Sequence, residues 1–572
     1  MTKAFGRRAG VRLLLAAALL CVAAVARSQA PSPSPSPSPG FVGAAHVNVV
    51  NVEVVVTDRS GAPATDLARE EFRAFHDGRP VAISNFVPPA PASAEPEERP
   101  SLSLFVVLDA DNLSIRTRKR LLGRLGDALA PLVADGGTRA MLVEGGPALR
   151  VRQPLGAADE AFLAALGKAA SDVSASTGTS SDESMFARVV EAQSAFSQGR
   201  PGTNTLEAAE ADGLLQEART AAQAAYERSR ASLVAAAEFV DTLAGVPGRK
   251  VLLLVSEGIP LRPGEAVLRR WESRYGAASG QMFSAELESA TATVGPQIDD
   301  LAARASAAGV AIYCLDAGLE GRSAERSAET VGRPVDTTFS NVRETSARFA
   351  LQALSAETGG RSIAASGDLP AALAAVVDEA AHAYSLGIAI PGEPDGTRHT
   401  LGVEVARPGL QPRLRRSYVD KTSDQRAADR GVAALLHGAT DNPLGIRLTS
   451  GTEIPQDDGT IVVPVSVHVP VGSLILLPEG DVHAARLSYW LAARDTAGRL
   501  RQIPRQSFTM RVPNQKLLEM LGQSASASFQ LVMRPGRHRV AATLRDDLGD
   551  GASTATIELD VGSPAAAPAE PD

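Results

Sequence analysis

Three apolar runs in the middle of the chain decide its fold. They read KVLLLV at residues 250–255, LSLFVVL at residues 102–108 and VAIYCL at residues 310–315. Aliphatic runs of this kind are typical of parallel strands that helices cover on both faces. The runs therefore predict an α/β fold with a doubly wound, mainly parallel sheet, and we assign this domain to residues 99–390.

Helical patterns separate these runs, as a doubly wound sheet requires. We expect shorter strands at residues 139–143, 149–152 and 361–364, and helices at residues 115–132, 157–169, 206–243, 297–308, 342–357 and 369–384. The three main strands lead into Asp109, Ser256 and Asp316. Because ligands of such sheets bind at the carboxyl ends of the strands, near a topological switch point, any site is expected there.

The segments on either side of this domain carry strand patterns. Residues 45–98 are predicted to form an N-terminal β module, in which Asp77-Gly78 suits the positive φ angles of a type I′ hairpin turn. Residues 391–420 are predicted to be β strands that close the α/β domain, and residues 421–444 are predicted to be a linker. Alternating patterns over residues 445–562 predict a C-terminal β-sandwich of immunoglobulin-like type.

The N-terminus has the features of an export signal. Arg7, Arg8 and Arg12 precede an apolar run at residues 13–26, and small residues suited to cleavage follow. We predict a signal peptide at residues 1–30, a Pro/Ser linker at residues 31–44, and a secreted or periplasmic location. A spanning helix needs about 20 residues, so we expect no stable membrane span after signal removal, with a retained anchor as the alternative. Residues 563–572 are predicted to be a disordered tail.

Composition excludes several classes of function. The chain has 57 Lys and Arg against 65 Asp and Glu, a net charge of -8, and no long basic run, which argues against nucleic-acid binding. Its two cysteines, Cys21 and Cys314, cannot form a disulfide framework or a cysteine zinc cluster. Its eight histidines follow neither HxH nor HExxH spacing, so no histidine metal centre is expected.

Several motifs together carry a resemblance to a known family. They read VEVVVTDRSGAPATDLAREEFRAFHDGRPVAISNF from residue 52, FVVLDADN from 105, GVPGRKVLLLVSEGIP from 245, AAGVAIYCLDAGL from 307, AETGGRSI from 356, AYSLGIAIP from 383 and RLRRSYV from 413. Over residues 47–418 the chain resembles the von Willebrand factor A-related domain proteins of the Acidobacteria type, a secreted family. The resemblance implies a von Willebrand A fold, secretion, and a role in binding rather than catalysis.

The resemblance also implies a metal-ion-dependent adhesion site. In a von Willebrand A domain, an Asp-x-Ser-x-Ser loop, a Thr and an Asp hold a divalent cation to which the ligand binds. Here Asp109 matches the leading Asp, Asp111 replaces the first Ser, and Leu113, which has no side-chain oxygen, replaces the second. Thr203 or Thr205 looks like the Thr, and Glu257 stands where the Asp-Gly pair usually begins. The site is therefore expected to be degenerate.

The candidate metal ligands are Asp109, Asp111, Thr203 and Glu257, assisted by Asn112 or Ser114. Mg²⁺ or another divalent cation is the candidate ion, because such hard cations take oxygen ligands. The alternative is that Asp109 caps the following helix while Asp111 and Glu257 are solvated loop acids. The sequence leaves both open.

The sequence leads to three hypotheses about function. The first is a secreted, non-catalytic protein-binding or adhesion-type protein whose partner is a protein ligand. The second is a metal-free structural scaffold of a cell-envelope assembly. The third is a hydrolase that uses the Asp109, Asp111 and Glu257 carboxylates, although no complete catalytic constellation or phosphate-binding loop is recognisable.

Overall fold

The computed structural model describes residues 47–89, 101–135, 137–172, 204–275, 283–318, 337–549 and 551–562. The predicted signal peptide, the Pro/Ser linker at 31–44, the tail at 563–572 and the candidate ligand Thr203 lie outside these ranges. Of the helices in the described ranges, none is both long and apolar enough to cross a membrane.

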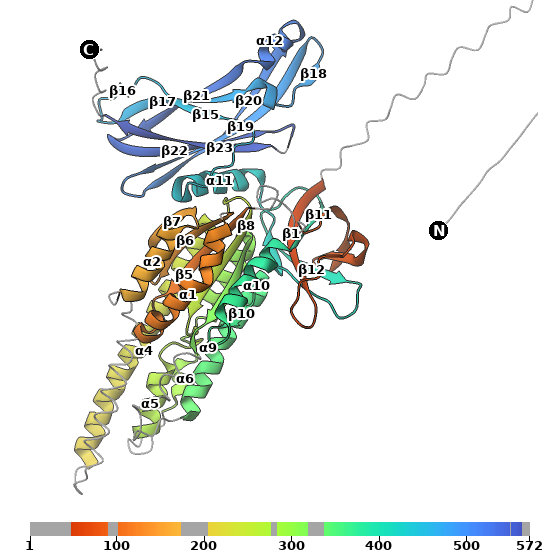
Figure 1. Ribbon diagram of the computed structural model, residues 1–572. Helices are drawn as coiled ribbons and strands as arrows, with labels where there is room; N and C mark the ends of the chain where they lie inside the picture. The colour runs from red at the N-terminus through yellow and green to blue at the C-terminus, as the bar shows by residue number, and fades with distance from the viewer. Residues whose placement is uncertain are drawn as a thin grey trace, which may run out of the picture. The chain divides into compact units, whose positions relative to one another are not determined.

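A six-stranded sheet forms the centre of the α/β part (Figure 1). Its strand order is β10-β9-β8-β5-β6-β7. Every neighbouring pair is parallel except β6 and β7, which are antiparallel. The strands are β5 (Leu102–Asp109), β6 (Thr138–Gly145), β7 (Arg150–Ala157), β8 (Arg249–Ser256), β9 (Val310–Asp316) and β10 (Ser362–Ala364). The predicted parallel sheet is confirmed.

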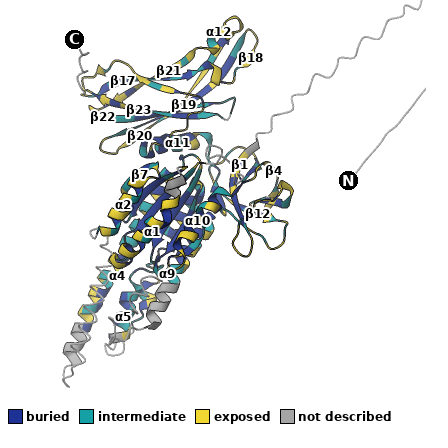
Figure 2. Ribbon diagram, in the orientation of Figure 1, coloured by how far each residue is buried: buried dark blue, intermediate teal, exposed yellow. Residues whose placement is uncertain are grey.

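Helices cover both faces of this sheet. One face packs against α1 (Ile115–Asp135), α2 (Glu160–Ser171) and α10 (Leu369–Ala381). The other packs against α4 (Asn204–Thr242), α7 (Gly295–Ala308) and α9 (Thr337–Thr358). Along β5, Leu104, Val106 and Leu108 belong to the first core while Phe105 and Val107 belong to the second. This alternation explains the unbroken apolar run, and Figure 2 shows these strands as buried.

Two further helices pack against α4. They are α5 (Glu265–Tyr275) and α6 (Ala285–Ser289), which the sequence patterns did not predict. Their core includes Trp271, which is fully buried and donates a 2.9 Å hydrogen bond from Nε1 to Ala211 O.

The β module draws its strands from both sides of the α/β part. Its sheets have the orders β13-β1-β11-β4 and β14-β12-β2-β3. The strands are β1 (Val47–Thr57), β2 (Phe72–His76), β3 (Arg79–Val81), β4 (Ile83–Val87), β11 (Tyr384–Pro391), β12 (Arg398–Val405), β13 (Gln411–Arg413) and β14 (Ser417–Val419). The predicted hairpin is present, because β2 pairs with β3 and both Asp77 and Gly78 have positive φ.

The sequence-based boundaries separate strands that the structure pairs. We assigned β11 to the α/β domain, yet it is antiparallel to β1 from Val47↔Pro391 to Val54↔Tyr384. We assigned residues 391–420 to strands closing the α/β domain, yet β12 pairs with β2 in the module. The patterns could not show this, because strand periodicity reports which face is buried and not which strand is the neighbour.

The segment predicted as a linker at 421–444 contains α11 (Ser423–His437). Thr422 and Gln425 form a capping box at its start, and Gly438 ends it in the left-handed conformation. These capping signals are visible in the sequence, and the predicted linker is wrong over residues 423–437.

The C-terminal strands form two sheets that share one core. One contains β15 (Arg447–Ser450), β16 (Ile454–Pro455), β17 (Ile461–Pro470) and β21 (Ser524–Met533). The other contains β18 (Leu477–Glu479), β19 (Val482–Asp495), β20 (Leu500–Pro513), β22 (Gly536–Asp546) and β23 (Ala552–Val561), and the short helix α12 (Leu517–Leu521) follows β20. The common core includes Val465 and Phe529 from the first sheet and Tyr489 and Val540 from the second. The mostly exposed β20 was not predicted as a separate strand; its apolar residues Phe508, Met510 and Val512 alternate only over its second half.

Candidate functional site

The carboxyl ends of β5 and β8 meet at the topological switch point of the sheet. β5 lies between β6 and β8, and α1, which follows β5, covers the opposite face of the sheet from α7, which connects β8 to β9 through α5 and α6. Ser256, the last residue of β8, donates a 2.7 Å hydrogen bond from Oγ to Oδ2 of Asp109, the last residue of β5. We call the loops after these two strands, residues 109–114 and 256–258, the rim.

Asp109 is the most deeply buried acid of the rim, and its pKa is shifted. It is 8% exposed, and its carboxylate also accepts hydrogen bonds from Asn112 N at 3.2 Å and from Asn112 Nδ2 at 3.0 Å. Burial raises the pKa of Asp109 to about 6, and the hydrogen bonds from Ser256 and Asn112 only partly offset it. The nearby charge of Asp111 also raises this pKa. Asp109 thus holds its loop in place, and its carboxyl group changes from neutral to charged as pH rises through about 6.

Glu257 joins the two loops of the rim. Its Oε1 accepts hydrogen bonds from Ser114 Oγ at 2.6 Å and from Ser114 N at 3.1 Å, and its own N–H donates to Asn112 O at 2.9 Å. Loops that are separated by more than a hundred residues of sequence are therefore tied by three hydrogen bonds. The structure brings Asp109 and Glu257 to a common rim.

Asp111 contacts a residue that the sequence did not suggest. Its Oδ2 accepts a hydrogen bond from Ser232 Oγ, on α4. Thr203 is not described, and Thr205 lies in α4 with its side chain outside the described positions. Ser232 thus brings a hydroxyl group from α4 to the rim. No local signal marks it, since Ser232 is one serine of a long helix.

The donor atoms of the rim are those that suit a hard cation. Asp109, Asp111 and Glu257 with Ser114, Ser232 and Ser256 offer only oxygen, as Mg²⁺ prefers. Each carboxylate is engaged by a different hydroxyl group, however. Within the described ranges, the one group of three acids or histidines whose ligand atoms all lie within 4.8 Å of one another is elsewhere, at His76, Asp77 and His399. The three rim carboxylates do not form such a group by themselves, and a cation held jointly by rim carboxylates and hydroxyl groups stays a prediction.

The carboxylate at the third strand end, that of Asp316, forms an ion pair with Arg348. Asp316, at the end of β9, accepts a 2.7 Å hydrogen bond from Arg348 Nε and a 3.0 Å hydrogen bond from Gly318 N. Leu113, at the position of the second Ser in the expected motif, is fully buried in the core beneath the rim. Neither residue adds a free ligand to the rim.

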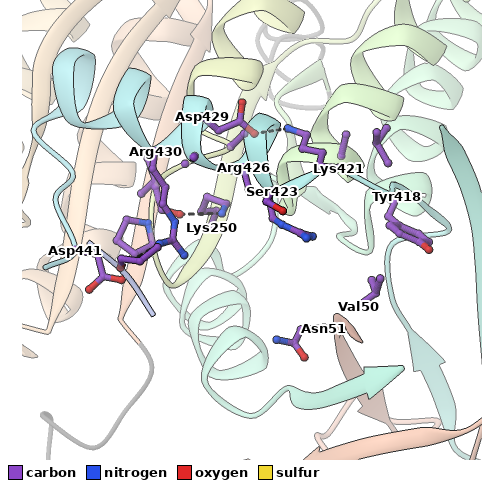
Figure 3. Close-up of a pocket in the computed structure, with 18 of the residues that line it drawn as sticks. Val50, Asn51, Lys250, Tyr418, Lys421, Ser423, Arg426, Asp429, Arg430 and Asp441 are labelled. Atoms are coloured by element: carbon purple, nitrogen blue, oxygen red, sulfur yellow. Dashed lines mark hydrogen bonds and ion pairs between the residues drawn. The ribbon is translucent and has the colours of Figure 1, made fainter. Parts of the chain in front are cut away.

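A second candidate place is a cavity of about 670 Å³ lined by β1, the start of β8, α11 and β23 (Figure 3). Its basic residues outnumber its acidic ones: they are Lys250, Arg415, Lys421, Arg426, Arg430 and Arg545, against Asp420, Asp429 and Asp441. Lys250 Nζ donates a 2.9 Å hydrogen bond to Val246 O. Burial, and secondarily the charge of Arg415, lowers the pKa of Lys250 to about 8. The cavity therefore carries positive charge that is only partly compensated.

The comparisons with known proteins find only weak similarity. No family model matches the chain, and a search of curated proteins finds no match. A von Willebrand factor type A protein from Catenulispora acidiphila is 11% identical, with a TM-score of 0.22 over 89% of this chain and 74% of that one. The pilus adhesin SpaC from Lactobacillus rhamnosus GG is 9% identical, with a TM-score of 0.25 over 81% of this chain and 54% of that one.

These two proteins are weak structural neighbours, and likenesses at such TM-scores carry no argument about fold or function. The mixed α/β character of the chain rests instead on its strand order, its parallel pairings and the two helical layers described above.

Proposed function

We propose that this chain is a secreted, non-catalytic protein-binding protein of adhesion type, and that its α/β domain, of von Willebrand A type, presents the rim to a protein ligand. The C-terminal strands would form an immunoglobulin-like sandwich that extends the molecule. The observation that carries the proposal is the joining of the two rim loops by Ser256 to Asp109 and by Ser114 to Glu257. A pre-organised rim loses little conformational entropy when a partner binds.

The contacts of the rim hydroxyls support binding rather than nucleophilic catalysis. Ser256 Oγ donates to Asp109 and accepts a 3.1 Å hydrogen bond from Gly258 N, so both partners hold it in place. An activated serine needs a base that can take its proton, which is commonly an imidazole. Among the described residues, Ser256 Oγ forms hydrogen bonds with a buried carboxylate and a backbone amide instead.

The second candidate, a metal-free scaffold in an envelope assembly, is favoured by one observation. Each rim carboxylate accepts a hydrogen bond from a hydroxyl group, which would hold the rim together without a cation. Under this alternative the rim is a structural joint between β5, β8 and α4, and it makes no contact with a ligand.

Retention of a protein by the immobilised full chain separates the two candidates. The probe is a detergent extract of envelope and secreted proteins from the source cells. We expect Asp111→Asn with Glu257→Gln to reduce retention of a specific protein at least tenfold. The matched control is Glu238→Gln, an exposed acid on α4, which should retain as much as the parent chain. Equal retention by the rim variant and the parent would contradict the proposal and favour the scaffold.

Calorimetry with Mg²⁺ and Mn²⁺ alone decides whether the rim uses a cation. Binding heat that disappears in Asp109→Ala would mean that the carboxylates rearrange around an ion. The absence of heat, together with rim-dependent retention of a protein, would mean that the ligand contacts the rim directly.

A further inference from the structure

Two histidines and an aspartate lie together in the β module, away from the rim. His76 is the last residue of β2, Asp77 begins the turn into β3, and His399 is the second residue of β12. His399 and Asp77 are 322 positions apart in the chain. These histidines have no metal-binding spacing in the sequence, and the fold brings them together.

The register of the two strands explains why the histidines meet. His76 is paired with Leu401 across β2 and β12. His399 lies two residues before Leu401, and residues two apart on a strand point to the same face. His76 and His399 are therefore diagonal neighbours on one face, within reach of each other for ring side chains. Their ring centroids are 4.7 Å apart.

The distances between the ligand atoms suit a tetrahedral ion. His399 Nδ1 lies 2.8 Å from Asp77 Oδ2, and His76 Nε2 lies 3.9 Å from the same oxygen. The three ligand atoms all lie within 4.8 Å of one another. Zinc–nitrogen bonds of about 2.0–2.1 Å in a tetrahedron put neighbouring ligand atoms about 3.3 Å apart. The two measured separations lie on either side of that value, so small side-chain rotations would admit an ion.

The contacts around the cluster are those that orient metal ligands. The other ring nitrogen of His399, Nε2, lies 3.2 Å from Asp395 Oδ2. Asp395 Oδ1 is itself held by Thr397 N at 2.7 Å and Thr397 Oγ1 at 2.9 Å. A metal-ligating histidine commonly donates its second N–H to a carboxylate, which leaves the first nitrogen free to bind the ion. Asp395 is placed to do this for His399.

Asp77 is oriented in the same way. Its Oδ1 accepts hydrogen bonds from Thr400 N at 2.8 Å and from Thr400 Oγ1 at 3.1 Å, which leaves Oδ2 facing the two histidines. The site is also open to solvent, since the side chains of His76, His399 and Asp77 are 17%, 18% and 46% exposed. An ion can therefore enter without unfolding the module.

We propose that His76, Asp77 and His399 form a binding site for a divalent transition-metal ion, with Zn²⁺ as the ion that the ligand set fits. Two imidazoles and one carboxylate suit Zn²⁺ better than Mg²⁺ or Ca²⁺, which take mainly oxygen ligands. Three protein ligands leave a fourth position for water or for a donor atom of a partner. The bound ion would add a further link between the β2–β3 turn and β12, which the hydrogen bonds of Asp77 already join.

Without a metal ion, a proton on His399 favours the contact between this ring and Asp77. The hydrogen bond to Asp77 raises the pKa of His399, Asp395 adds to this rise, and burial opposes it. His76 and Tyr418 also face this ring, with centroids 4.7 Å and 5.7 Å away. The ion must displace the proton from His399, so its binding weakens as pH falls below the pKa of this histidine.

The experiment is a titration of the full chain with Zn²⁺ alone, read by calorimetry at pH 7.5 and by metal content after dialysis. We expect one bound zinc per chain, a thermal midpoint that rises with zinc, and affinity at least tenfold weaker at pH 5. His76→Gln and His399→Gln should each weaken binding at least tenfold and remove the zinc-dependent rise.

The matched control is His382→Gln. His382 Nδ1 lies 2.8 Å from Asp378 Oδ1, which reproduces one histidine–carboxylate pair, and it belongs to no three-membered group among the described residues. This variant should bind zinc like the parent. If His399→Gln loses the fold of the turn, His76→Gln decides, because the ring of His76 has a single hydrogen-bond contact among the described residues, with Tyr418 Oη at 3.2 Å. No zinc in the parent, or parent-like zinc binding in His76→Gln, overturns the proposal.

Discussion

Ser256 Oγ donates a 2.7 Å hydrogen bond to Asp109 Oδ2, and this bond joins the last residues of β8 and β5 across the switch point of the sheet. Ser256 is fully buried and Asp109 is 8% exposed, so water competes little for either partner. A hydrogen bond to a buried carboxylate is worth more than one at the surface. The rim thus depends on two residues from different strands.

Removal of this donor should destabilise the fold. Ser256→Ala leaves Asp109 with one fewer partner, and we expect the free energy of unfolding to fall by about 1–3 kcal/mol at pH 7. The pKa of Asp109 should rise above its value of about 6. Urea denaturation measures the first change. Ser273→Ala, at an exposed serine of α5, is the control and should cost less than about 0.5 kcal/mol.

The raised pKa of Asp109 predicts a specific dependence of stability on pH. Because its pKa is about 6 in the folded chain and 3.8 ordinarily, the folded state holds a proton between these values that the unfolded state has lost. The stability due to this group is therefore largest below about pH 4 and falls as pH rises through 6. Asp109→Asn should gain up to about 3 kcal/mol relative to the parent between pH 4 and pH 8. Parallel stability curves would contradict this.

A buried ion pair beneath β6 should be costly to break. Arg118 is 1% exposed, contacts Glu144 Oε1 through Nη2 and donates a 2.7 Å hydrogen bond from Nε to Ala169 O. Glu144→Gln would leave the guanidinium buried without a countercharge, and we expect a loss of about 3–5 kcal/mol. Asp300→Asn breaks the exposed pair with Arg304 and should cost less than about 1 kcal/mol. Similar losses in both variants, measured by chemical denaturation, would show that burial does not govern the effect.

The approach of β10 to β9 depends on a residue without a side chain. A Cβ at Gly360 would lie 1.9 Å from Ile312 O, so Gly360→Ala must push the two strands apart. We expect a loss of at least about 1–3 kcal/mol. Gly123→Ala is the matched control, since its Cβ would meet no atom within 4 Å in α1, and it should stabilise the chain slightly. Thermal unfolding of the two variants distinguishes close packing from helix propensity.

The lowered pKa of Lys250 predicts a pH dependence of stability that is opposite in sign to that of Asp109. Its pKa is about 8 in the folded chain and 10.5 ordinarily, so between these values the unfolded state holds the extra proton. Stability from this group therefore rises with pH across that window. Lys250→Met should remove this rise, and stability measured from pH 7.5 to pH 10.5 tests it. A rise that survives in the variant would mean that other groups cause it.

Local patterns were sufficient for the parallel sheet and its rim. The apolar runs at residues 102–108, 250–255 and 310–315 favour strands buried on both faces, and the carboxyl ends of parallel strands share an edge. The Asp77-Gly78 turn was equally readable, because few dipeptides accept two positive φ angles. In each case the physical constraint acts over a few neighbouring residues.

Partners that are distant in sequence depended on the tertiary structure. The pairing of β1 with β11, the hydrogen bond from Ser232 to Asp111 and the meeting of His76 with His399 each join residues more than a hundred positions apart. Periodicity reports whether a residue is buried, but it carries no record of which distant segment supplies the neighbour. That choice follows from the register and packing of the complete chain, where each contact is stable only because many others form with it.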